Sequence, residues 1–152
     1  MKKKVIALGN RVMGDDAIGI KVTEFLKNWI SERGFEAIIG ETDIDHCISQ
    51  IEDNDYLIII DAAYFNEEPG KINVFPISEL SHQHKKGYSQ HEMNLLQLLN
   101  IQRTKVTGYC ICIEIECIEF SCELSNTLKG KFLEISEGVK KEIQNILEVL
   151  SY

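Results

Sequence analysis

Three side chains far apart in this sequence could together bind a divalent cation: Asp16, Asp61 and His91. Each is predicted to lie at a strand–helix junction or at the start of a helix. In an α/β fold such junctions meet at one edge of the sheet. Two carboxylate oxygens and one imidazole nitrogen leave open positions on a metal ion, as a catalytic or substrate-borne metal needs. The sequence therefore predicts a cation site at the carboxyl edge of a sheet.

The first carboxylates follow an apolar run, residues 5–8, that reaches Gly9 and crosses a short polar loop into an amphipathic helix. Asp15 and Asp16 stand where that helix should begin. Two carboxylates there would repel a phosphate, and neither G-x-G-x-x-G nor G-K-[ST] is present. A simpler alternative stays open, in which Asp15 caps the helix and Asp16 favours its first turn.

Asp61 directly follows the continuous apolar run 57–60, with Ala62 and Ala63 leaving space beside it. Such a run is typical of a central strand in a parallel sheet. The Asp61 carboxylate would then lie at the same sheet edge as the first loop. The alternative is a loop-initiating aspartate that bonds to its own backbone.

His91 is placed in the first turn of a helix, because Ser89-x-x-Glu92 matches a capping box. The helix dipole there disfavours the imidazolium and helps to keep the ring neutral, the form that binds a metal. A histidine of purely structural role is the alternative for an isolated position. The other three histidines, His46, His82 and His84, are predicted to be solvated. No G-x-S-x-G or H-E-x-x-H motif competes.

The elements that must position these residues alternate between strands and helices. The expected strands are 4–8, 35–39, 56–60, 72–76 (antiparallel or at an edge) and 105–117, and the expected helices are 16–31, 44–51 behind a Thr42-x-x-Asp45 capping box, one from Ser89, and 125 or 126–150. Residues 78–88 are predicted to form a polar loop. This order indicates one α/β domain over residues 1–152, with a mostly parallel sheet between helices.

Composition narrows the class of protein. A net charge of −8 without a basic stripe disfavours nucleic acid and anionic membranes as partners. No apolar run approaches the roughly 20 residues that span a bilayer. Gly9 also interrupts the first apolar run too early for a signal peptide. The five cysteines lack zinc-ribbon spacing and are expected to be free, buried thiols, with Cys110 and Cys112 on one side of a sheet. A cytoplasmic protein is expected.

With these motifs in place, the chain resembles the hydrogenase maturation protease family. The family's opening motif G-N-x-L-x-x-D-[DE]-x-x-G is matched by residues 9–19, and its apolar strand ending in Asp-Ala by Asp61-Ala62. Its Ser-x-His helix start is matched by Ser89-Gln90-His91, and a Leu-Ser before the last helix by Leu124-Ser125. The likeness covers nearly the whole chain in order.

The resemblance implies a three-layer αβα sandwich around a twisted sheet. It implies an endopeptidase that removes the C-terminal extension of a [NiFe] hydrogenase large-subunit precursor, with Asp16, Asp61 and His91 contacting nickel. That nickel is expected to arrive in the precursor and not to be held tightly by the free enzyme. The precursor is then the partner, and the enzyme is expected to be a monomer. One of the two carboxylates, Asp16 or Asp61, would polarise a water against the scissile carbonyl.

Substrate contacts are expected from Asn10, Asp15, Thr42 and Asp43. The last two lie in Gly40-Glu41-Thr42-Asp43, which is more acidic than the Gly-Gly-Thr type of the family. Two other functions stay open: a non-catalytic metal-binding accessory protein, and a divergent peptidase acting on another precursor. A flavodoxin-like or nucleotide-binding module is disfavoured by the missing phosphate loop.

Overall fold

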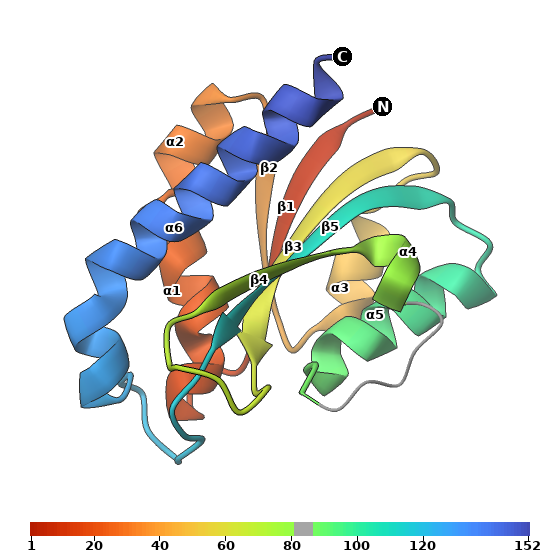
Figure 1. Ribbon diagram of the computed structural model, residues 1–152. Helices are drawn as coiled ribbons and strands as arrows, with labels where there is room; N and C mark the ends of the chain where they lie inside the picture. Colours follow the sequence, from red (N-terminus) through yellow and green to blue (C-terminus); the bar gives the residue numbers. More distant parts are fainter. Residues whose placement is uncertain (81–86) are drawn as a thin grey trace.

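The computed structural model, which describes residues 1–80 and 87–152, is built on one five-stranded sheet (Figure 1). Four strands are parallel and the edge strand β4 is antiparallel to β5. This confirms the mostly parallel sheet and the antiparallel edge. The strand order is β2-β1-β3-β5-β4, with bounds β1 Lys3–Leu8, β2 Glu36–Glu41, β3 Asp55–Ala63, β4 Ile72–Pro76 and β5 Val106–Glu114.

Helices cover both faces of the sheet, which confirms the three-layer αβα architecture (Figure 1). One face carries α1 (Ile18–Phe25), α2 (Lys27–Glu32) and α6 (Asn126–Leu150). The other carries α3 (Ile44–Ser49), α4 (Ile77–Leu80) and α5 (Gln90–Ile101). A short 3-10 helix, η1 (Gly14–Ala17), precedes α1.

The burial of β3 explains why the apolar run 57–60 lies at the centre of the sheet. All nine of its residues are buried, as expected for a strand covered by helices on both faces. Alternate side chains enter the two cores: Ile58 and Ile60 lie with α1 and α6, and Leu57 and Ile59 lie with α5. The sheet is thereby fixed between two apolar layers.

The prediction of one continuous helix over residues 16–31 is wrong. It begins as η1 and breaks at Leu26, whose φ and ψ are −93° and 3°. Leu26 is buried, whereas the preceding Phe25 is 56% exposed. Phe25 instead packs edge-on against Phe132 of α6, with ring centroids 5.5 Å apart.

Other helix and strand boundaries also differ from the predicted ones. The strand expected over 105–117 ends at Glu114, and Asp43, not Thr42, caps α3 by accepting from the His46 N–H at 2.9 Å. The predicted polar loop 78–88 starts with α4, and its residues 81–86, which include His82 and His84, lie outside the described residues.

The cysteines divide into two groups. Cys47, Cys110 and Cys112 are buried and free, and the last two share one face of the sheet, as predicted. Cys117 and Cys122 are exposed, so the expectation of burial is wrong for this pair, which lies in a loop beyond β5. No helix in the described ranges is long and apolar enough to cross a membrane.

Candidate active site

The three residues predicted from the sequence form what we call the acid–histidine cluster: Asp16, Asp61 and His91. Asp16 lies in η1 after β1, Asp61 lies near the end of β3, and His91 lies in the first turn of α5. The Nε2 atom of His91 is 3.4 Å from Oδ2 of Asp16, although 75 residues separate them. Their side chains are 24% and 13% exposed, respectively. Both therefore remain accessible to a ligand.

Asp61 is the buried member of the cluster. Its side chain is fully buried; Oδ1 accepts from the Ala62 N–H at 2.7 Å and Oδ2 accepts from the Ser89 hydroxyl. Ser89 also caps α5 by accepting from the Glu92 N–H at 3.3 Å, which confirms the predicted helix start. Ser89 therefore ties Asp61 to the helix that carries His91. Because β3 continues through Ala63, Asp61 does not begin a loop.

Asp16 is held by the loop that follows β1. Its Oδ2 accepts from the Asn10 N–H at 2.8 Å, and Oδ1 of Asn10 accepts from the Val12 N–H at 3.1 Å. Asn10 therefore shapes the loop that presents Asp16. The loop glycine that makes this possible is Gly9 (φ 145°), where a Cβ would lie 2.3 Å from the Asp16 carbonyl oxygen.

The cluster is electrostatically coupled. Burial raises the pKa of Asp61 to about 7; the Ser89 hydrogen bond opposes the rise, the negative charge of Asp16 adds to it, and His91 opposes it. The hydrogen bond to Asp16 raises the pKa of His91, burial opposes that rise, and the charge of Asp61 adds to it. The two carboxylates therefore act on His91 against the helix dipole, which was expected to favour the neutral ring.

This donor set suits a borderline divalent cation, since imidazole and carboxylates both bind such ions. A cation would also relieve the repulsion between Asp16 and Asp61 that contributes to the raised pKa of Asp61. In residues 1–80 and 87–152, no group of three or more His, Cys, Asp or Glu side chains is arranged to hold a metal ion.

Besides Asn10, three residues were expected to contact the substrate, and two of them are exposed. Thr42 and Asp43 are exposed in the turn after β2, which the Gly9 N–H joins to the first loop through the Glu41 carbonyl at 3.1 Å. Asp15 differs, because it is only 1% exposed and its carboxylate accepts three backbone N–H groups. Its side chain organises a loop and does not face solvent. Nor does it cap the helix, since the cap of η1 has no side-chain hydrogen bond.

Two further residues of the site region were missed from the sequence. The sequence predicts Ser89 as a helix cap but not as a donor to Asp61. It predicts Glu92 as the second half of a capping box, yet Glu92 is fully buried and accepts from the Cys112 thiol at 3.7 Å. A signal for Glu92 did exist, because it stands at helical spacing from the buried Leu95, Leu96 and Leu99.

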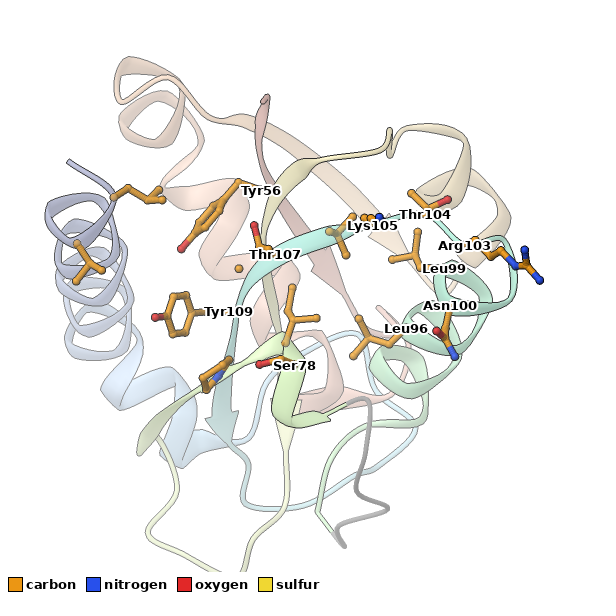
Figure 2. Close-up of a pocket in the computed structure, with 16 residues that line it drawn as sticks. Tyr56, Ser78, Leu96, Leu99, Asn100, Arg103, Thr104, Lys105, Thr107 and Tyr109 are labelled. Atoms are coloured by element: carbon orange, nitrogen blue, oxygen red, sulfur yellow. The ribbon is translucent and has the colours of Figure 1, made fainter. Parts of the chain in front are cut away.

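A cavity of about 830 Å³ lies elsewhere, around the beginning of β5 (Figure 2). Tyr56, Thr107 and Tyr109 line it from the strands, and Leu96 and Leu99 line it from α5. No member of the acid–histidine cluster contributes to it. The candidate site is thus identified by its chemistry and not by the volume of a hollow.

The fold and site define an α/β protein with an acid–histidine cluster at the carboxyl edge of its sheet. Comparisons with known proteins show the family to which it belongs. A family model described as hydrogenase maturation protease, HycI, matches residues 20–151. The chain is 26% identical to MJ0253 of Methanocaldococcus jannaschii, a protein whose name places it among hydrogenase maturation proteases; the match covers 97% of each chain.

Solved structures give the same result. The [NiFe] hydrogenase maturation protease HybD from Thermococcus kodakarensis matches with a TM-score of 0.71 and 26% identity over 93% of this chain and 98% of that one. The hydrogenase maturating endopeptidase HybD from Escherichia coli matches with a TM-score of 0.72 and 20% identity, covering 95% and 93%. The chain belongs to the hydrogenase maturation protease family, and it is a protease, a hydrolase that acts on peptide bonds.

Proposed function

We propose that this endopeptidase removes the C-terminal extension of a [NiFe] hydrogenase large-subunit precursor that already carries nickel. The convergence of Asp16, Asp61 and His91 at one edge of the sheet is the observation that carries the proposal, above all the 3.4 Å approach of His91 to Asp16. The family membership and the [NiFe] relative from Thermococcus kodakarensis support the class of substrate.

In this proposal the three side chains recognise nickel as part of the substrate. Nickel in the precursor would supply a positive charge that fixes the scissile segment against the two carboxylates and the imidazole. An incomplete donor set suits such recognition, because the remaining ligands come from the precursor. A precursor without nickel would bind weakly, so cleavage would follow metal insertion.

Asp61 is our candidate for the group that activates water. Its pKa of about 7 lies near neutral pH, where a carboxylate can accept a proton from water as the oxygen attacks the scissile carbonyl. The proton then passes to the departing amine, so the carboxylate is regenerated. Asp16 has a different task, since its contacts with His91 and with the Asn10 N–H suit it to orient the imidazole and the substrate.

The turn after β2 and the loop after β1 are proposed to contact the precursor. Thr42 and Asp43 are exposed there, and Asn10 supports the loop between them and Asp16. The extra acidity of this turn would favour a precursor with basic residues near the cleavage point.

The test is to incubate the nickel-loaded precursor with the enzyme and to follow the mass of the large subunit. Wild-type enzyme should remove the extension, and Asp16→Ala and His91→Ala should each slow removal by about a hundredfold or more. His46→Ala, at an exposed position of α3, is the matched control and should cleave as the wild type does. Undiminished processing by both cluster variants would reject the proposal. No mass change with the wild type would favour a metal-binding accessory protein.

A further inference from the structure

An exposed apolar surface adjoins the loop that leads to Asp16. It is carried by the loop before α6, residues 115–125, which we call the rim loop, and by Val12 of the loop after β1. Phe120 is 85% exposed, Ile118 is 55% exposed and Val12 is 41% exposed. Single exposed apolar side chains are ordinary on a protein surface, but several on adjoining loops mark an interaction surface.

Backbone hydrogen bonds join the rim loop to the loop that presents Asp16. The Gly14 N–H donates to the Ser121 carbonyl at 2.8 Å, and the Ser121 N–H donates to the Val12 carbonyl at 2.9 Å. Val12 is therefore held next to Ser121, the residue that follows Phe120. The two loops lie together at the lower end of the molecule in Figure 1, at the carboxyl ends of the strands.

Asp15 fixes the shape of the rim loop from within. Its Oδ1 accepts from the Ser125 N–H at 2.7 Å, and its Oδ2 accepts from the N–H groups of Glu116 and Cys117 at 3.1 and 3.3 Å. These donors stand at both ends of the loop. An ionised carboxylate is costly to bury unless such donors satisfy it. The residue next to Asp16 thus positions an exposed apolar surface, and a surface held in advance binds with a smaller entropy loss.

The charge of the rim loop indicates what would bind there. Glu116 and Glu119 flank Ile118, both are exposed, and neither forms a salt bridge with any residue that the structure describes. Glu123 is paired with Lys129 at 3.0 Å. A partner would therefore have to supply apolar side chains together with a positive charge.

We propose that the rim loop selects the substrate: Ile118 and Phe120 contact an apolar segment of the precursor that is flanked by a basic residue, while the scissile bond lies at the acid–histidine cluster. This inference rests on the proposed function, because it takes the precursor as the occupant. Phe120 is the anchor, since aromatic side chains supply large contact area at protein interfaces. This surface is continuous with the candidate site, because one short loop connects Val12 to Asp16.

The experiment compares Phe120→Ser and Ile118→Ser with Leu133→Ser, a control on α6 whose side chain is 66% exposed. KM and kcat are measured with the nickel-loaded precursor, and KM should rise about tenfold for Phe120→Ser, with a smaller change in kcat. Because these side chains are exposed, thermal unfolding should stay unchanged. The affinity of the precursor is measured in parallel in the Asp61→Asn background, where Phe120→Ser should weaken binding by a similar factor.

The two arms separate the two proposals. If the wild type cleaves and all three serine variants keep its KM within twofold, the inference on the rim loop is overturned and the proposed function stands. If the wild type does not cleave but Phe120→Ser still weakens binding, the rim loop is a docking surface of a protein that is not a processing enzyme for this precursor. Equal effects of Leu133→Ser and Phe120→Ser would also overturn the inference.

Discussion

Two buried aspartates lie at the same edge of the sheet, and their surroundings differ. Asp15 is 1% exposed and accepts three backbone N–H groups, so its charge is matched by fixed donors. Asp61 is fully buried and accepts one backbone N–H and one hydroxyl, while the negative charge of Asp16 acts on it. Asp15 thus joins two loops, whereas Asp61 is left with a pKa of about 7, which suits the role proposed for it.

The same sheet edge thus holds one carboxylate with few hydrogen-bond donors, Asp61, and one with three backbone donors, Asp15. Strongly perturbed carboxylates in clefts are candidates for function, and well-bonded ones support structure. Replacing Asp15 should cost stability and replacing Asp61 should cost activity. The comparison is therefore open to direct experiment.

The largest expected effect is on catalysis, from Asp61→Asn. Removing the proposed base should reduce the rate of precursor cleavage by about a thousandfold. The same variant should be more stable than the wild type at pH 8, by about 1–3 kcal/mol, because a buried carboxylate no longer has to ionise. Rates are measured from the mass change of the large subunit, and stability is measured by urea unfolding.

The pH dependence of the stability gained by Asp61→Asn follows from the direction of the pKa shift of Asp61. Asp61 has its pKa raised from 3.8 to about 7 on folding, so the folded chain binds more protons than the unfolded chain between these values. The free energy of unfolding of the wild type therefore falls as the pH rises through this window. The advantage of Asp61→Asn should shrink towards pH 4, and a constant difference from pH 4 to pH 8 would contradict the assignment.

The second effect concerns Asp15→Ala, which leaves three backbone N–H groups of the rim loop without their acceptor. The free energy of unfolding should fall by about 3 kcal/mol, because hydrogen bonds to a buried charge are strong and their orphaned donors are costly. Asp45→Ala, at an exposed position in the first turn of α3, should change it by less than about 0.5 kcal/mol.

Asp15→Ala should also raise the KM for the precursor, since the rim loop would no longer be held beside Asp16. A loss of stability with an unchanged KM would show that Asp15 supports the fold but not the docking surface. An unchanged stability would remove the contrast between Asp15 and Asp61.

Much of this architecture could be predicted from the sequence because its signals are local. The apolar run before Asp61 predicts a buried central strand, and Ser89 predicts the start of α5. The order of strands and helices then brings Asp16, Asp61 and His91 to one edge. The 3.4 Å distance between His91 and Asp16 is in keeping with that expectation.

The remaining features depend on contacts between distant segments. The three donors to Asp15 come from residues 101 to 110 positions away, so no local pattern distinguishes Asp15 from a helix cap. The effect of Asp16 and Asp61 on the pKa of His91 is also absent from local patterns, since the helix dipole is a local property and these carboxylates are distant in sequence. The burial of Glu92 was missed for a different reason, because the capping-box pattern and the apolar stripe of α5 both include that position.

Replacing Glu92 should have the smallest effect on stability, and it bears on the comparison of Asp15 with Asp61. Its side chain is fully buried, its Oε1 accepts from the Cys112 thiol at 3.7 Å, and its Oε2 has no hydrogen-bond partner within the described part of the chain. Burial raises the pKa of Glu92 well above its ordinary 4.5, and the charge of Asp61 adds to the rise. Folding therefore favours the neutral form of the Glu92 carboxyl over its ionised form.

Glu92→Gln should then raise the free energy of unfolding at pH 8 by about 1 kcal/mol, since the amide has the same shape and no charge to lose. The gain should decline towards pH 4, where the unfolded chain also protonates. Urea unfolding between pH 4 and pH 8 measures it, with the exposed Glu148→Gln as the control. If Glu92→Gln instead destabilises the protein equally at every pH, Glu92 is ionised in the fold, and Asp61 would then have two negative neighbours in place of one.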